Sequence, residues 1–174
     1  STGLFGVVSR FPILECRLLA NEVLPGAGQA WLGWIVVQTP AGQPLRILAA
    51  DMPSSPRIAR GIVAGDVAKL LARSGPPAAP DLVLGDLNCT PGSVIIDALA
   101  PGMRPAPPWR SIGWLCTYRR PWPFLRIDAM LARPGLEWRG YRTLDLGIGE
   151  HRAQQGVLAV PHGLEPPGAR SGRR

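Results

Sequence analysis

Short apolar runs that end at proline or glycine dominate this chain of 174 residues, and they restrict its fold more than any other feature. Runs of this kind, rich in β-branched and aromatic residues, are typical of strands. We therefore expect strands at residues 4–9, 14–20, 31–39, 45–50, 81–85, 114–118, 126–132, 137–145 and 155–160.

Two segments have helical periodicity instead. Ser55 is placed to cap the first helix and Pro56 suits its first position, and apolar residues then recur at helical spacing as far as residue 74. The second helix is expected at residues 90–99. Because strands often follow one another directly, the pattern predicts an α+β fold, a layered β-sandwich flanked by helices, rather than an alternating doubly wound sheet.

One domain is expected at residues 1–160, since the chain is short and its composition is that of an ordinary globular protein. Residues 161–174 are rich in proline, glycine and arginine and predict a disordered basic tail. No apolar run approaches the roughly 20 residues that a membrane-spanning helix needs, so we expect no transmembrane segment. Nothing in the sequence indicates a compartment.

The chain has a net charge of +7, and all but one of its basic residues are arginine. The guanidinium group matches phosphate oxygens well, so the charge favours a phosphate-bearing partner. The alternative is that arginine, alanine, glycine and proline are abundant because the coding genome is rich in G and C.

The most informative motif is the apolar run at residues 81–85 that leads into Asp86 and Asn88. Side chains two residues apart on an extended strand face the same way, so this carboxylate and this carboxamide can converge on one ligand. Such a pair suits phosphate chemistry. The alternative is a strand that ends in an Asx turn, because Asp and Asn both favour turns.

Two further segments hold polar residues in unusual places. Asp128 interrupts an apolar strand, where an unpaired carboxylate is costly, and His151 follows Glu150 near the end of the chain. A carboxylate that orients an imidazole would satisfy both groups. The alternatives are a salt bridge from Asp128 to an arginine and a surface position for His151.

The order Gly-Asp-x-Asn, then Ile-Asp, then an acid followed by histidine resembles the endonuclease/exonuclease/phosphatase superfamily. Residues 6–13, which read GVVSRFPI, also look like a strand of that family, and the resemblance extends to about residue 160. It implies a deoxyribonuclease-like fold and hydrolysis of a phosphoester with Mg²⁺, or alternatively Mn²⁺, as cofactor.

The resemblance also implies roles by position. Asp86 would polarise or deprotonate the attacking water, and Asn88 would help to hold the phosphate. His151 would contact the scissile phosphate, with Asp128 orienting its ring. Asp86 and Glu150 would bind the metal.

Two departures from the family pattern stand out. The family takes a metal-binding glutamate from strands upstream of the GVVSRFPI segment, so we expect the fold to be incomplete at its N-terminus, with an unpaired sheet edge, weak Mg²⁺ binding and slow turnover. Asp51 stands where the family commonly has histidine, and it is a third candidate metal ligand.

An aromatic and arginine-rich segment precedes Asp128. From it we take Arg119, Arg120, Trp122 and Arg126 as substrate-binding residues, since rings can stack on bases and arginines can pair with phosphates. Trp109 and Arg110 belong to the same segment. The alternative is that Trp114 and Tyr118 are core and that the arginines solvate a turn.

The sequence thus favours a metal-dependent hydrolase of phosphoesters, a phosphodiesterase or nuclease. Nucleic acid is the first choice of substrate, and phospholipid or sugar phosphate comes after it. The competing hypothesis is a non-catalytic basic domain, descended from the same family, that binds or scaffolds.

Overall fold

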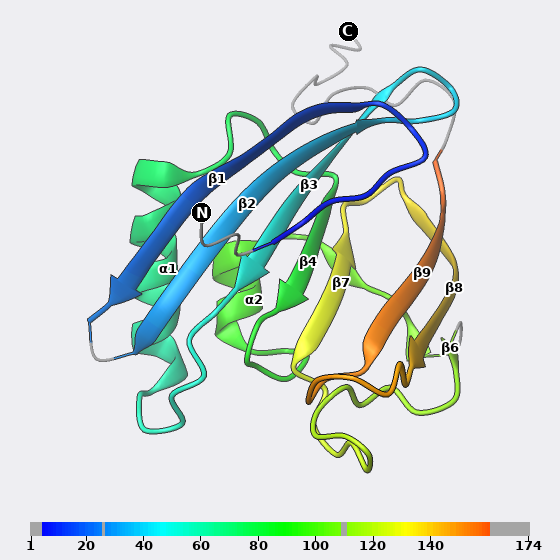
Figure 1. Ribbon diagram of the computed structural model, residues 1–174. Coiled ribbons are helices and arrows are strands. Elements are labelled where there is room, and N and C mark those ends of the chain that lie inside the picture. The colour runs from blue at the N-terminus through cyan, green and yellow to red at the C-terminus, as the bar shows by residue number, and fades with distance from the viewer. Residues whose placement is uncertain (1–4, 26, 109–110, 161–174) are drawn as a thin grey trace, which may run out of the picture.

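The computed structural model describes residues 5–25, 27–108 and 111–160, which form two sheets and two helices (Figure 1). In spatial order, the larger sheet consists of β1 (Ile13–Leu24), β2 (Gly28–Gln38), β3 (Pro44–Asp51), β4 (Leu82–Asp86), β7 (Asp128–Ala132) and β5 (Arg104–Pro105). The smaller sheet consists of β6 (Ser111–Ile112), β8 (Glu137–Leu144) and β9 (Ala153–Ala159). The helices are α1 (Arg60–Ser74) and α2 (Val94–Leu99).

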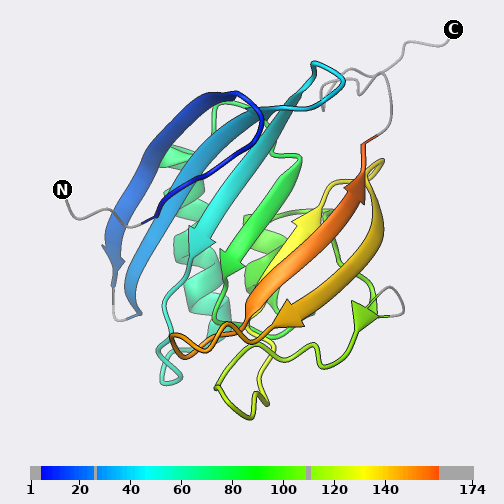
Figure 2. The same ribbon diagram turned by 45° about the vertical axis from the view of Figure 1, so that its right-hand side comes forward.

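The elements form three layers. Both helices cover one face of the larger sheet, and the smaller sheet lies against the other face at its β4–β7 end (Figures 1 and 2). One core, which includes Leu48, Val67 and Leu131, lies between the helices and the larger sheet. A second core, which includes Leu82 and Trp138, lies between the two sheets. The expected α+β sandwich flanked by helices is confirmed.

The register of the larger sheet brings four polar or aromatic residues into one row. Trp31 pairs with Asp51, Asp51 pairs with Asp86, and Asp86 pairs with Asp128. Strands β3 and β4 are parallel and end at this row, whereas β7 is antiparallel and begins there. Paired residues of a sheet lie on the same face, so three aspartates converge at one edge of it.

Two expected strands are absent from the described residues. Residues 5–9 form no strand; instead the ring of Phe5 stacks on Trp31, with centroids 5.2 Å apart, and covers Gly33. Aromatic stacking on the sheet face thus replaces ladder pairing in this segment. At 114–118 only Tyr118 forms isolated bridges, because the chain turns there into a hairpin closed by local hydrogen bonds. The other expected strands are confirmed to within a few residues at their ends.

Both helices begin about four residues later than expected. The cap of α1 is Ala59 rather than Ser55, and the guanidinium of Arg60 donates to the carbonyls of Pro53 and Ser55, which holds the preceding segment in a turn. Helix α2 begins after Ser93, whose hydroxyl accepts from a backbone N–H of the first turn. A turn at residues 90–92 occupies the expected first turn of this helix.

Strand β1 is an edge strand of the larger sheet, and Leu14, Leu18 and Val23 on it are exposed. The smaller sheet covers only the β4–β7 end of the larger one (Figure 2). The expected basic tail at residues 161–174 lies outside the described residues. Of the helices in the described part of the chain, none is long and apolar enough to cross a membrane.

Gly85 sets how closely β3 and β4 approach next to the aspartate row. It has a φ of 142°, and an added Cβ would lie 1.9 Å from the carbonyl oxygen of Ala50.

We expect Gly85→Ala to destabilise the protein by about 3 kcal/mol or more, because both backbone strain and overpacking oppose it. Gly65→Ala, on the exposed side of α1 with nothing within 4 Å, should instead stabilise by about 0.5–1 kcal/mol. Urea unfolding of the two variants measures both changes, and equal stability would contradict the tight contact at Gly85.

Candidate active site

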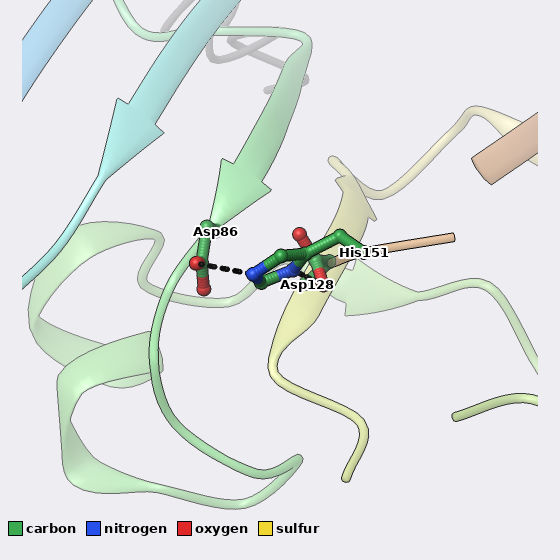
Figure 3. Close-up of side chains that lie close together, drawn as sticks. All are labelled: Asp86, Asp128 and His151. Carbon is green, nitrogen blue, oxygen red and sulfur yellow. Dashed lines mark hydrogen bonds and ion pairs between the residues drawn. The ribbon is translucent and has the colours of Figure 1, made fainter. Parts of the chain in front are cut away.

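Two side chains of the larger sheet and one from a loop of the smaller sheet meet at the edge where the aspartate row ends (Figure 3). Asp86 closes β4 and Asp128 opens β7, directly opposite in register. His151 comes from the connection between β8 and β9, and its Nδ1 lies 2.9 Å from Asp128 Oδ2. Its Nε2 lies 3.7 Å from Asp86 Oδ2. Asp128, which the sequence showed interrupting an apolar strand, thus has the imidazole as its partner.

The ring of His151 is held in place from several sides. Tyr118 lies beside it, with ring centroids 4.9 Å apart, and the two residues also form a backbone bridge. The hydroxyl oxygen of Thr117 accepts from the backbone N–H of Asp128 at 3.4 Å. The hairpin before β7 therefore positions both members of the His–Asp pair.

Asn88 shares the turn that follows β4 with Asp86. Its backbone N–H donates to Asp86 Oδ1 at 2.9 Å, and its Nδ2 donates to the carbonyl of Met52 at 2.7 Å. Its φ is 46°, a left-handed conformation that asparagine tolerates. The Asx-turn alternative thus describes the local backbone correctly, and one amide hydrogen remains for a ligand.

A pocket of about 550 Å³ opens in front of these residues and is lined by Asp86, Asn88, Tyr118 and His151. Arg60, the first residue of α1, also lines it, although it was not among the site residues expected from the sequence. Its guanidinium is tethered to backbone carbonyls of the β3–α1 loop and brings a fixed positive charge to the pocket. No signal in the sequence distinguished it, because the helix was expected to begin at Pro56, four residues before Arg60.

Burial and neighbouring charge shift the pKa values of the site. Burial raises the pKa of Asp86 to about 6, the hydrogen bond from Asn88 opposes the rise, and the charge of Asp128 adds to it. For His151, burial lowers the pKa, but the hydrogen bond and charge of Asp128 and the charge of Asp86 outweigh it and raise the pKa above its ordinary value.

The other two candidate metal ligands have partners elsewhere. Asp51 accepts a 2.9 Å hydrogen bond from the indole N–H of Trp31, and burial raises its pKa in spite of that bond. Glu150 lines the pocket but is exposed, with a carboxylate oxygen 3.3 Å from the guanidinium of Arg119. Metal binding by either residue would require it to share or leave its present partner.

Among the described residues, Asp86, Asp128 and His151 form a group whose possible ligand atoms lie within 4.8 Å of one another. Two carboxylate oxygens and an imidazole nitrogen fit a divalent cation of the Mg²⁺ or Mn²⁺ type, with nitrogen suiting Mn²⁺ better. The donor set is therefore compatible with the expected cofactor.

The four expected substrate-binding residues have different surroundings. Arg119 pairs with Glu150 at the pocket, whereas Arg120 pairs with Asp145 and donates to the carbonyl of Gly149. Arg126 donates to the carbonyl of Ala106 and lies over the ring of Tyr141. Trp122 is exposed. Trp109 and Arg110 lie outside the described residues.

Comparisons with known proteins identify the family and the fold. The family model described as "Endonuclease/Exonuclease/phosphatase family" matches residues 3–148. A search of curated proteins gave no match.

Solved structures with a similar fold include an endonuclease/exonuclease/phosphatase from Bacteroides vulgatus, with a TM-score of 0.62 and 17% identity over 87% of this chain and 67% of that one. A mannosyl-6-phosphatase from Bacteroides thetaiotaomicron has a TM-score of 0.60 and 16% identity over 86% of this chain and 67% of its own. A conserved protein of unknown function from Enterococcus faecalis has a TM-score of 0.62 and 15% identity over 86% of this chain and 67% of that one. At these identities the likeness shows the fold, and the chain spans about two thirds of the length of each.

The raised pKa values of Asp86 and His151 predict how stability depends on pH in chelator. An unfolded aspartate titrates near 4, so between about pH 4 and 6 the folded protein binds more protons at Asp86 than the unfolded protein does. Stability should therefore fall as pH rises through this window, and His151 adds a loss of the same sign above about pH 6.5.

Asp86→Asn removes the larger of these effects. In chelator we expect this variant to have a higher thermal-unfolding midpoint than wild type at pH 8 and a similar one at pH 4.5. Asp97→Asn, at an exposed site on α2, is the matched control and should show no gain at pH 8. Mg²⁺ should raise the midpoint of the wild type and not that of Asp86→Asn. A lower midpoint for Asp86→Asn at pH 8 would contradict the assigned electrostatics.

Proposed function

Because the chain belongs to the endonuclease/exonuclease/phosphatase family, we propose that it is a metal-dependent hydrolase of phosphoester bonds that prefers phosphodiesters, with nucleic acid as the first choice of substrate. The observation that carries the proposal is the cluster of Asp86, Asp128 and His151, of which Asp86 and His151 line one pocket. Asp86 and Asp128 lie on the larger sheet and His151 lies on the connection between two strands of the smaller sheet, and no core packing requires two carboxylates and an imidazole to meet there.

His151 and Asp128 act as a unit in this proposal. Asp128 accepts from Nδ1–H and so fixes both the tautomer and the orientation of the ring. Nε2 is then directed toward Asp86 and the pocket, where in the protonated ring it donates to a phosphoryl oxygen. The raised pKa of His151 favours this charged form near neutral pH.

Asp86 orients the attacking water and accepts its proton. A pKa near 6 makes its carboxylate ionised at pH 7 and more basic than an ordinary aspartate, which suits a general base. Asn88 and Arg60 line the same pocket and offer N–H donors to the other phosphoryl oxygens. A carboxamide does this without repelling the substrate, and the guanidinium adds positive charge.

Because the protonated ring of His151 has no nitrogen lone pair for a metal and Asp128 accepts from that ring, Asp86 would supply ligand atoms for the cation, with Glu150 and Asp51 as further candidates. A bound Mg²⁺ or Mn²⁺ supplies positive charge that offsets the negative charge developing on the phosphoryl group.

A basic domain that binds without catalysis is the second candidate. Two observations favour it: Asp51 is hydrogen-bonded to Trp31, and Glu150 is paired with Arg119, so two of the three expected metal ligands are engaged elsewhere. A catalytic domain and a domain that only binds differ in whether they hydrolyse a phosphoester when metal is present.

Hydrolysis of bis(p-nitrophenyl) phosphate and of p-nitrophenyl phosphate tests the proposal, in a protein that contains this chain. We expect hydrolysis with Mg²⁺ or Mn²⁺, none above background with chelator, and a faster rate for the diester. Equal background rates in metal and in chelator would leave only the binding domain. A faster monoester rate would favour a phosphatase like the structurally similar mannosyl-6-phosphatase.

Variants of the His–Asp pair test the roles. His151→Ala should lower kcat by about 10²–10³-fold, because it removes the charged hydrogen-bond donor to the phosphoryl oxygen. Asp128→Asn should lower it by about 10–100-fold, because the asparagine orients the ring less well. The double variant should be no slower than His151→Ala, since Asp128 acts through the imidazole. Losses that multiply would show that Asp128 acts on the substrate independently.

A further inference from the structure

A second pocket, of about 400 Å³, lies next to the active-site pocket and is lined by Trp114, Trp122 and Arg152. The active-site residues named above do not line it. Its size is within the range of pockets that hold small ligands or single groups of larger ones.

The two pockets share two chain segments. In the hairpin of residues 117–125, Tyr118 pairs with Leu125, and both line the active-site pocket, whereas Trp122 at the tip lines the second pocket. Likewise His151 lines the first pocket and Arg152, the next residue, lines the second. The two pockets therefore border the same hairpin and the same short stretch of the β8–β9 connection.

The tryptophans of the second pocket are exposed to an unusual degree. Trp114 is 61% exposed and Trp122 is 78% exposed, whereas Trp34 and Trp138 are buried in the core. Trp114 is therefore not a core residue. Two exposed indoles at one pocket offer ring faces to a planar ligand, since stacking on an indole face is favourable for any nucleobase.

Arg152 supplies a positive charge in the same pocket. Its backbone N–H donates to the carbonyl of Thr117 at 2.7 Å, which holds it in place, and its buried Nε has no hydrogen-bond partner among the described residues. Asp145 is the nearby carboxylate, but it is paired with Arg120 at 2.6 Å. The charges of both arginines lower the pKa of Asp145, after the larger effect of the hydrogen bond from Gly147. Two guanidinium groups around one carboxylate leave a net positive charge that is available to an anion.

We propose that this pocket binds a nucleotide adjacent to the scissile phosphate, with its base stacked on Trp122 and Trp114 and its phosphate paired with Arg152. The inference rests on the proposed function and narrows its substrate to a single-stranded nucleic acid, because a base can reach an indole face only when it is not stacked in a duplex. The net charge of +7 agrees with a ligand that carries several phosphates, as a strand does and a sugar monophosphate does not.

Binding measured in chelator separates this inference from catalysis. The probes are a fluorescein-labelled oligothymidylate of eight nucleotides and a strand of the same length in which tetrahydrofuran spacers replace the nucleosides, so that the phosphates remain and the bases are absent. Fluorescence anisotropy with wild type should show at least about 10-fold tighter binding of the oligothymidylate.

Variants then assign the contacts. Trp122→Ala should weaken oligothymidylate binding by about 10-fold and leave the abasic strand unchanged, whereas Trp122→Phe should retain most of the affinity. Arg152→Gln should weaken both strands and reduce the slope of log Kd against log salt by about one. The controls are Phe11→Ala, an exposed aromatic residue outside both pockets, and Arg139→Gln, which pairs with Glu137 on β8. Neither control should change the preference for bases.

Equal affinity of wild type for the two strands, or unchanged oligothymidylate binding in Trp122→Ala, would overturn the inference. Tighter competition by mannose 6-phosphate than by thymidine monophosphate would also overturn it. None of these results depends on hydrolysis. Failure of the phosphodiesterase assay would remove the proposed function alone, since the stacking site would still distinguish the two strands.

Discussion

The register between β3, β4 and β7 is the constraint on which the site depends. It places Asp51, Asp86 and Asp128 in one row on the face of the larger sheet that meets the smaller sheet. Side chains alternate between faces along a strand, so a slip of β7 by one residue would turn Asp128 toward the helix-facing core and away from His151. Gly85 fixes this register from within, because only a residue without Cβ allows β4 to lie so close to the carbonyl of Ala50. The glycine before Asp86 is therefore a packing requirement as well as part of a motif.

The same register makes the site electrostatically unfavourable when it is empty of cations. Burial and the charge of Asp128 raise the pKa of Asp86 to about 6, so the fold places a carboxylate where its ionised form is poorly solvated. The protonated ring of His151 offsets part of this cost, because it lies 2.9 Å from one carboxylate and 3.7 Å from the other. Functional sites of this kind often lower the stability of the fold, and here the unfavourable charges lie at the edge where both sheets meet.

The sequence predicted the residues that meet at the candidate site, but not much of their surroundings. An apolar strand that ends in Asp86, and an aspartate inside another apolar strand, are local signals with a physical cost, so they indicate a site. The partners of the arginines are set by tertiary contacts. Nothing in the local sequence distinguishes Arg60 and Arg152, which line pockets, from Arg126, which packs against Tyr141. The prediction of a strand at residues 4–9 was wrong for a similar reason, since Phe5 stacks on Trp31 and the described residues of the segment pair with no strand.

Arg120 links the hairpin to the rest of the candidate site through contacts within the chain. Its backbone N–H donates to the carbonyl of Glu150, its guanidinium donates to the carbonyl of Gly149, and the same group pairs with Asp145. These contacts join the hairpin tip to the connection between β8 and β9, which carries His151. Arg120 thereby fixes the position of the hairpin, which lies between the two pockets. The position is fixed relative to the imidazole of His151 in the active-site pocket and to the guanidinium of Arg152 in the second pocket. The basic and aromatic residues before β7 thus divide into those that hold the hairpin in place and those, led by Trp122, that it presents to a ligand.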